Sequence, residues 1–319
     1  MGVWKKVLIG GGIAALIILI LGLSLGLTLG RTKIKSTFFS KCEKFKEHDC
    51  KKLWDLFEKA HVNKDPCNVP VEAYNPLIAE VPFKLDCNKV MFWSNTKDLV
   101  HDLTAKRKDC FVTLEDTLLG SILDGLMWCG KEGKNGTFSN GCPGWSECEN
   151  NPVRSFWKCA SAAFADAACG DVTAMLSGST TTPFDPTSIF ASIEVTRLKA
   201  PRVSSMNVVM VLKKNAKSDC TNASLKNLQN QLDPNMCVTE ELTTCRVLDS
   251  TSLGTSHALQ GMEVYLPSPH SLLVADGVRR RCVGGSCCLG LGARVCTGSL
   301  PVAAWWGLAP MAQSDPFRR

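Results

Sequence analysis

The chain begins with an apolar segment that is long enough to cross a membrane. From Val7 to Leu29, 23 consecutive residues carry no charged side chain. A helix of this length spans roughly 34 Å, which covers the hydrocarbon core of a bilayer. A cleaved signal peptide is the alternative, but its apolar region is usually shorter, about 7–15 residues. We therefore predict a retained signal-anchor over residues 7–29, preceded by a short N-terminus of residues 1–6.

Cysteine content indicates on which side of the membrane the body lies. The 319 residues include 17 cysteines, and this density is typical of extracellular proteins held by disulfides. Because the count is odd, at least one thiol is unpaired within the chain or pairs with another chain. The sequons beginning at Asn135 and Asn222 also favour the secretory lumen, and we predict glycosylation at both. Basic residues on both flanks of the apolar segment slightly favour the opposite orientation. We predict a single-pass type II protein of the cell membrane, with a cytosolic N-terminus and an extracellular body.

Composition divides the rest of the chain into three parts. Residues 30–40 form a polar stalk, residues 41–249 form a body large enough for one domain or two lobes, and residues 250–319 form an atypical tail. The tail shows no helical or strand period, so we predict that it is poorly ordered. The alternative is a small module held by disulfides among Cys282, Cys287, Cys288 and Cys296. The net charge of +6 is spread along the chain and gives no reason to expect nucleic-acid binding.

Helical periodicity dominates the first half of the body. Apolar residues recur at helical spacing over residues 50–60, 98–104 and 152–168. A further helix begins near Thr113, where Thr113 and Asp116 have the spacing of a capping box.

The second half mixes strands with helix. Residues 189–195 alternate, which predicts a strand with Phe190, Ser192 and Glu194 on one side. The apolar run from Val208 to Leu212 predicts a buried parallel strand, and residues 224–231 fit a helix. Helices followed by mixed elements indicate an α/β fold with a helical lobe.

The common catalytic and metal motifs are absent from the sequence. There is no C-x-x-C, no H-E-x-x-H and no dinucleotide-binding glycine fingerprint, and only five histidines occur. We therefore predict no metal site. The G-x-S-x-G match at residues 22–26 lies inside the apolar segment, so it is not a nucleophile elbow.

Tryptophans and carboxylates remain as candidates. Trp93, Trp128, Trp145 and Trp157 could each be packed in the core or could stack on a ligand.

The carboxylates are equally open to two interpretations. Glu194 is either an exposed rim charge or a site residue, and Glu115 and Asp116 could simply complement a helix dipole. Glu115 and Asp124 lie nine residues apart, on opposite sides of a helical wheel. Either the helix breaks at Gly120 or one of these carboxylates has another role.

Several longer motifs together resemble one family. They are Thr113-Leu-Glu-Asp-Thr-Leu-Leu-Gly120, Trp128-Cys-Gly130, Cys142-Pro-Gly-Trp145, Asn150-Asn-Pro-Val153, Phe164-Ala-Asp-Ala-Ala-Cys169 and Ser188-Ile-Phe-Ala-Ser-Ile-Glu-Val195. Over residues 42 to 237 the chain resembles the ADP-ribosyl cyclase / NAD⁺ glycohydrolase family, and the N-terminal anchor is similar to that of its membrane-bound branch. The resemblance implies a two-lobed α/β fold, with a helical N-terminal lobe and a C-terminal lobe built on a parallel sheet.

The resemblance also implies roles for individual residues. Glu194 would be the catalytic carboxylate, with Glu115 as a second carboxylate. The other implied substrate-binding residues are Trp93 and Trp157 as stacking walls, Asp124 near the nicotinamide, and Ser94, Ser161 and Phe190 around the ribose and phosphates. The implied disulfides are Cys42–Cys50, Cys67–Cys148, Cys87–Cys169, Cys129–Cys142 and Cys220–Cys237.

The implied activity is cleavage of the nicotinamide–ribosyl bond of NAD⁺. The products would be ADP-ribose and cyclic ADP-ribose, and the family also hydrolyses cyclic ADP-ribose and exchanges the base of NADP, in connection with calcium signalling. NAD⁺ would be the substrate, and no cofactor is implied. The resemblance leaves homodimerisation and a cell-surface protein ligand open.

Some residues depart from the family pattern. Asn95 stands where an arginine that contacts phosphate is common, and Ile189 stands where a threonine is common. A lost charge-assisted hydrogen bond costs about 1.5–3 kcal/mol, so we expect weaker substrate affinity. Cys110 and Cys159 have no partner in the family pattern, and Cys245 has lost its usual one. These changes motivate the alternative of a catalytically weak receptor or adhesion protein with the same fold.

Overall fold

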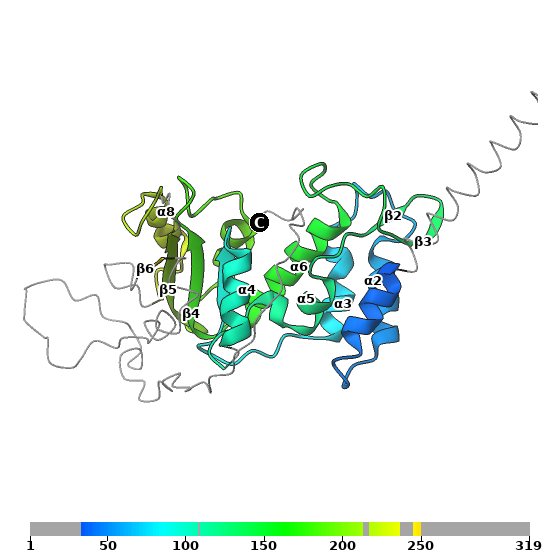
Figure 1. The fold of residues 1–319 in the computed structure, drawn as a ribbon, viewed down its shortest axis with the longest axis horizontal. Coiled ribbons are helices and arrows are strands. Elements are labelled where there is room, and N and C mark those ends of the chain that lie inside the picture. Colours follow the sequence, from blue (N-terminus) through cyan, green and yellow to red (C-terminus); the bar gives the residue numbers. More distant parts are fainter. Residues whose placement is uncertain (1–32, 108, 213–216, 237–244, 250–319) are drawn as a thin grey trace, which may run out of the picture. The chain divides into compact units, whose positions relative to one another are not determined.

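The computed structural model describes residues 33–107, 109–212, 217–236 and 245–249 (Figure 1). The predicted membrane segment, the tail and Cys237 lie outside the described residues. Among the described residues, no helix has both the length and the apolar character needed to span a bilayer. The chain divides into two compact units, which interleave along the sequence.

The first unit comprises the residues up to Pro82 together with Thr117–Ala160. Helices predominate in it, with one β-hairpin. Its elements are α2 (Cys50–His61), η1 (Val71–Tyr74), α3 (Asn75–Glu80), α5 (Leu118–Leu123), β2 (Cys129–Lys131), β3 (Lys134–Phe138) and most of α6 (Pro152–Ala167). Asp49 begins α2, because its carboxylate accepts hydrogen bonds from the backbone N–H groups of Lys51 and Lys52.

Aromatic rings form the core of the first unit. Trp128 packs edge-on against Phe57 and Phe156, with ring centroids 5.2 and 5.7 Å apart, and Tyr74 packs against Phe156 at 5.5 Å. Trp128 is fully buried, so packing in the core is its role. Trp145 instead lies on a loop, where the guanidinium of Arg154 stands 5.9 Å from its ring.

A chain of polar groups crosses this aromatic core. His61 Nε2 lies 2.9 Å from Thr137 Oγ1, and the Thr137 hydroxyl donates to Glu58 Oε1 at 3.1 Å. On the other side of the imidazole, Nδ1 lies 3.5 Å from the Tyr74 hydroxyl, which accepts the Trp128 indole N–H at 2.9 Å. These partners suit a neutral imidazole that carries its proton on Nε2.

Burial keeps this histidine neutral, and stability should therefore depend on pH. Burial, helped by the nearby charge of Lys64, lowers the pKa of His61 to about 3. Between about pH 6.5 and 3 the unfolded chain binds a proton that the folded chain does not bind. The free energy of unfolding should therefore fall by up to about 1.4 kcal/mol for each pH unit below 6.5. Urea titrations of wild type and His61→Gln should show a shallower pH dependence in the variant.

Exposed His48 supplies the control for this experiment. His48→Gln should keep the wild-type pH dependence. An unchanged slope in His61→Gln would show that other groups govern the acid sensitivity.

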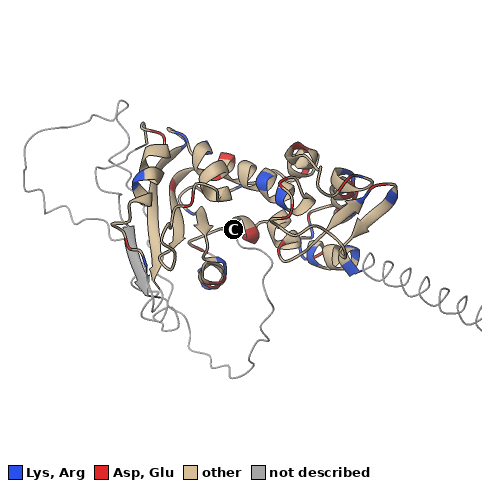
Figure 2. Ribbon diagram, turned by 90° about the horizontal axis from the view of Figure 1, so that it is seen from above, with Lys and Arg blue, Asp and Glu red and all other residues tan. Residues whose placement is uncertain are grey.

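The second unit comprises Phe83–Asp116 and the residues from Ser161 onward. A parallel sheet with the strand order β1-β4-β5-β6 forms its centre (Figure 1). The elements are β1 (Met91–Ser94), α4 (Lys97–Lys106), η2 (Leu114–Asp116), the end of α6, β4 (Gly170–Ser177), η3 (Phe190–Glu194), α7 (Val195–Arg197), β5 (Val203–Leu212), α8 (Ser224–Gln231) and β6 (Cys245–Asp249). Helix α4 packs on the sheet through Val100 and Leu103, which share a buried cluster with Trp93 and Met175. Acidic and basic residues are interspersed over the ribbons of both units (Figure 2).

The mixed α/β fold with a parallel sheet agrees with the expectation from the sequence. The predicted helices over 50–60, 98–104, 152–168 and 224–231 are confirmed, as is the parallel strand that contains Val208–Leu212. The two units are not consecutive lobes, because Phe83–Asp116 belongs to the unit that contains the sheet.

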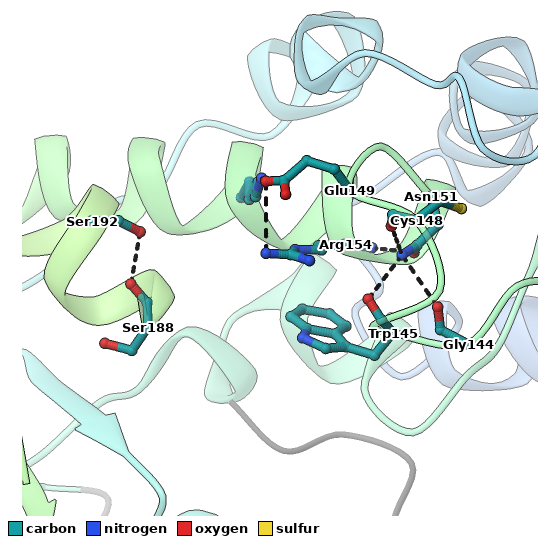
Figure 3. Close-up of polar contacts among 9 residues, drawn as sticks. Gly144, Trp145, Cys148, Glu149, Asn151, Arg154, Ser188 and Ser192 are labelled. Carbon is teal, nitrogen blue, oxygen red and sulfur yellow. Dashed lines mark hydrogen bonds and ion pairs between the residues drawn. The ribbon is translucent and has the colours of Figure 1, made fainter. Parts of the chain in front are cut away.

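The strand predicted over residues 189–195 is wrong. Residues 190–194 form a turn of π-helix that leads directly into α7. Ser188 begins the helical segment, because its hydroxyl accepts the backbone N–H of Ala191 at 3.1 Å. The backbone N–H of Ser192 donates to the Ser188 carbonyl at 2.9 Å, as in a helix, and the Ser192 hydroxyl donates to the same carbonyl at 2.6 Å (Figure 3). This local hydrogen bonding prevails over the alternating pattern.

The expected polar stalk over residues 30–40 also needs correction. Residues 33–42 are helical, and Ile34 and Phe38 are buried. Phe38 packs edge-on against Trp54 at 5.1 Å, so this segment is part of the first unit's core.

Disulfides lie within both units. Four of the implied pairs are present, and they are Cys42–Cys50, Cys67–Cys148, Cys87–Cys169 and Cys129–Cys142. Cys110 and Cys220 also take part in disulfides. Cys159 is buried, with its sulfur 3.3 Å from Asn75 Oδ1.

Candidate active site

A small hollow in the second unit runs along β1 to its carboxyl end. The carboxyl ends of parallel strands are the usual place for ligand sites in α/β folds. The lining residues come from β1, η2, α6 and the helical turn 188–194, and they are Met91, Phe92, Trp93, Ser94, Leu114, Phe164, Ser188, Ile189, Phe190 and Glu194. Most of them are apolar or aromatic, so a carboxylate among them stands out.

Glu194 is the acidic residue that lines this hollow. It is the last residue of η3 and only 5% exposed. A helical turn rather than a strand therefore holds the carboxylate, and single turns of π-helix occur frequently at functional sites. Phe190 begins the same turn and packs against Phe92 at 6.1 Å and Phe184 at 5.9 Å. These buried rings fix the turn and, with it, the position of Glu194.

Trp93 and Glu115 form a directly bonded pair. The indole N–H of Trp93 donates to Glu115 Oε2 at 3.1 Å, and both side chains are less than a tenth exposed. Glu115 lies on η2, where the carboxylate of Asp116 accepts the backbone N–H and the hydroxyl of Thr113. Asp116 therefore bonds back to Thr113, which is half of a capping box, but the segment is a three-residue 3₁₀ turn and the predicted helix begins only at Leu118. Asp116 closes this turn, while Glu115 contacts the tryptophan.

Two buried serines have hydroxyl groups with no hydrogen-bond partner in the described part of the chain. They are Ser94, in the hollow, and Ser161, on α6, and each is at most 1% exposed. A buried hydroxyl is nearly always hydrogen-bonded in a native protein, so such groups commonly mark a place where a ligand or water binds.

Asp124 and Trp157 belong to the first unit. Asp124 ends α5, and its backbone carbonyl accepts the ammonium of Lys41 at 2.9 Å. Trp157 lies on α6, is 2% exposed and packs edge-on against Phe156 at 5.1 Å. Ser161 follows it by one helical turn, so the two residues share a face of α6. Their roles in substrate binding stay predictions.

The loop that precedes α6 is anchored by Asn151 (Figure 3). Its amide donates to the carbonyls of Trp145 at 3.2 Å and Cys148 at 2.9 Å, while its carbonyl oxygen accepts the N–H of Arg154. One side chain therefore closes the loop and caps the helix that carries Trp157.

The two sequons differ in their surroundings. Asn135 is exposed on β3. Asn222 uses both hydrogens of its amide, which donate to the Thr181 carbonyl at 3.1 Å and to Ser218 Oγ at 2.8 Å. A glycan on Asn222 would break one of these bonds, whereas a glycan on Asn135 would break none that the described residues make. Glycosylation of both stays a prediction.

Comparison with known proteins places the chain in a family. A family model described as ADP-ribosyl cyclase matches residues 31–250. The chain belongs to the ADP-ribosyl cyclase family. ADP-ribosyl cyclase/cyclic ADP-ribose hydrolase 1 of rat (Rattus norvegicus) is 41% identical over 187 residues, or 58% of this chain and 61% of the rat protein. The rabbit protein (Oryctolagus cuniculus) is 36% identical over 243 residues, or 70% of this chain and 81% of its own. The alignment thus spans less than two thirds of the rat relative.

Solved structures support the same assignment. A structure described as CD38 in a covalent enzyme–substrate complex is 30% identical, with a TM-score of 0.61, and the match covers 72% of this chain and 95% of that one. Porcine CD38 with a covalent intermediate is 30% identical, with a TM-score of 0.59 and coverages of 68% and 95%. Aplysia cyclase with the substrate NGD and the product cGDPR is 28% identical, with a TM-score of 0.58 and coverages of 68% and 87%.

Two departures from the family pattern lie at or beside the hollow. Ile189 lines it with an apolar side chain. Asn95 follows Ser94 with a φ of 56°, a left-handed conformation that asparagine tolerates better than most residues. Neither side chain can supply the charge of an arginine.

Sequence reasoning missed several residues of the site. Leu114 and Ser188 line the hollow, and His101 approaches Glu115, but none was a candidate. Only Ser188 gave a signal, since a serine three residues before Ala191 is a common helix start. His101 lies on α4 and is partly buried, and the sequence around it matches no motif.

Proposed function

We propose that this protein cleaves the nicotinamide–ribose bond of NAD⁺ at the hollow beside β1. The observation that carries the proposal is the buried carboxylate of Glu194 among aromatic side chains in a member of the ADP-ribosyl cyclase family. Two related enzymes support this proposal: porcine CD38 has been solved with a covalent intermediate, and Aplysia cyclase with the product cGDPR.

The chemistry requires a negative group beside the anomeric carbon. Nicotinamide leaves NAD⁺ as a neutral molecule, taking the electron pair of the C–N bond, and C1′ of the ribose is left with oxocarbenium character. The Glu194 carboxylate stabilises this positive charge or forms an ester bond to C1′. Because the carboxylate is buried, the stabilisation is stronger than it would be in water.

The second step determines the product. Water that attacks C1′ loses a proton and gives ADP-ribose, whereas a ring nitrogen of the adenine that attacks C1′ gives cyclic ADP-ribose. In both cases the bond to Glu194 breaks and the carboxylate is regenerated. Trp93 offers a flat surface for stacking a base, worth about 1–3 kcal/mol in nucleic-acid systems. We propose that Glu115, bonded to Trp93, influences the choice between the two attacks.

The setting of this reaction is also a proposal. Disulfides within both units fit an oxidising compartment, which supports an extracellular catalytic body. We propose a type II ectoenzyme anchored by residues 7–29, with NADP as a further substrate for base exchange.

A catalytically weak receptor is the second candidate, because Ile189 lines the hollow with no polar group for the diphosphate. One assay separates the two. Cells that display the full-length chain should release nicotinamide from external NAD⁺ and form ADP-ribose and cyclic ADP-ribose. Chain that reaches the cell surface but releases no nicotinamide would favour the receptor.

A further inference from the structure

Helix α4 meets the η2 turn at two successive positions. His101 Nε2 lies 3.9 Å from Glu115 Oε2, and one turn later the Thr104 hydroxyl donates to Asp116 Oδ1 at 3.3 Å. Each of the two acidic residues of the turn therefore faces one side chain of α4. All four residues belong to the second unit.

His101 touches both members of the Trp93–Glu115 pair. Its ring stands edge-on to the Trp93 indole, with centroids 6.1 Å apart and planes at 89°. Its Nε2 approaches the same carboxylate oxygen, Oε2, that accepts the indole N–H. A separation of 3.9 Å is an ion-pair distance, too long for a direct hydrogen bond.

The surroundings make the charge of this histidine important. The Glu115 side chain is 4% exposed, so its ionised form needs a nearby donor or cation, and the Trp93 N–H is a neutral donor. The His101 side chain is 30% exposed although its Nε2 is buried, so proton exchange with solvent takes place through the exposed part of the ring. An unperturbed histidine titrates near pH 6.5.

Other charged residues lie on the elements that pack around His101. Asp116 faces it from η2 but is already bound to Thr113 and Thr104. On α4 itself, Lys97 and Asp98 lie one turn earlier and Asp102 follows directly, and the two aspartates are exposed. From β1, the neutral ring of Trp93 contacts His101. Of these groups, Glu115 is the buried one whose carboxylate lies at ion-pair distance from His101.

We propose that His101 is a positioning residue whose protonated form holds Glu115 ionised and in place against Trp93, and thereby makes the ratio of cyclic to linear product depend on pH. This inference rests on the proposed function, since it concerns the partition step that follows loss of nicotinamide. Protonated His101 holds the Glu115 carboxylate in place. Neutral His101 no longer favours the charged carboxylate, and Glu115→Gln, which lacks this charge, imitates that state.

The product ratio in two oppositely designed variants tests this role. In the full-length chain, we expect the wild-type ratio to change by about fivefold or more between about pH 5.5 and 8, the lower range for coupling between two groups. His101→Arg keeps a positive charge and should hold the acidic wild-type ratio at every pH. His101→Gln should hold the alkaline ratio, shifted in the same direction as Glu115→Gln. Nicotinamide release, measured in the same samples, separates any effect on the first step from the change in product ratio.

A double variant and an exposed histidine complete the design. His101→Gln combined with Glu115→Gln should shift the ratio no further than Glu115→Gln alone, because the two residues act as one unit. His48→Gln should leave the wild-type curve unchanged. A wild-type pH curve in His101→Gln, or additive effects in the double variant, would overturn the proposal.

A measurement independent of turnover separates this proposal from the proposed function. In an NMR titration of the full-length chain, Glu115→Gln should lower the pKa of His101, because it removes the carboxylate that favours the imidazolium. An unchanged pKa would overturn the coupling even in an active enzyme. A lowered pKa in a chain that releases no nicotinamide would instead refute the proposed reaction and leave the coupling established.

Discussion

Glu194→Gln should reduce nicotinamide release from NAD⁺ by about 10²–10³-fold or more, without unfolding the protein. The amide has nearly the same shape as the carboxylate, so the aromatic packing around η3 should persist. It carries no negative charge to stabilise the oxocarbenium ion, and it is a poor nucleophile toward C1′. Steady-state release of nicotinamide by the full-length chain measures the effect.

Two controls make this result specific. Glu132→Gln changes an exposed carboxylate in the hairpin of the first unit and should leave the rate unchanged. Thermal unfolding of Glu194→Gln should match that of wild type, and NAD⁺ should still bind, because the aromatic walls remain. A variant that retains more than about a tenth of the wild-type rate, a loss far smaller than removal of an essential electrostatic group causes, would place the chemistry elsewhere.

Helices could be predicted from the sequence better than strands, because the hydrogen bonds of a helix join residues that are close in sequence. Helix α8 spans Ser224–Gln231 as expected, and α6 ends within one residue of its predicted end. Helical hydrogen bonds join residues four apart, so a single segment contains the evidence for them. Strand β1 is only four residues long and wholly buried, so it shows no alternation, and its partner β4 lies about eighty residues further along the chain. Neither strand was singled out.

The segment around Glu194 shows where a periodic pattern is ambiguous. Seven residues that alternate also fit a short helix, and the hydroxyls of Ser188 and Ser192 decide in favour of the helix. Local hydrogen bonds also explain why Glu115 and Asp124 do not lie on opposite sides of one helix. Thr117 starts a new helix by accepting the N–H of Gly120, so the break precedes Leu118 rather than occurring at Gly120.

The candidate site shows what a single sequence leaves out. Glu194, Trp93, Ser94 and Phe190 were named through the family resemblance, and the hollow brings these four together. Periodicity could not have joined them, because Trp93 and Glu194 lie about a hundred residues apart and meet where η3 packs against β1. His101 has no motif at all, and only the packing of α4 against η2 reveals its place beside Glu115.

Gly130 is the position where the smallest change should have the largest effect on stability. A Cβ atom built on Gly130 would lie 1.9 Å from the backbone oxygen of His61 and 2.9 Å from its carbonyl carbon. Strand β2 therefore passes against the end of α2 at a distance that only glycine permits. Neither side can yield easily, because Cys129 is fixed by its disulfide with Cys142 and the His61 ring is bonded to Thr137.

Gly130→Ala should lower the free energy of unfolding by about 3 kcal/mol or more, the upper range for overpacking, because a backbone atom rather than a flexible side chain must move. Most domains have only about 5–15 kcal/mol of stability, so we expect little folded protein at the cell surface and a much lower urea midpoint. Gly144→Ala is the matched control: its nearest neighbour is the flexible Glu147 side chain at 3.5 Å, and it should cost little. Equal midpoints for the two variants would show that β2 can move away from α2, and that the disulfide and the His61 hydrogen bonds do not hold it there.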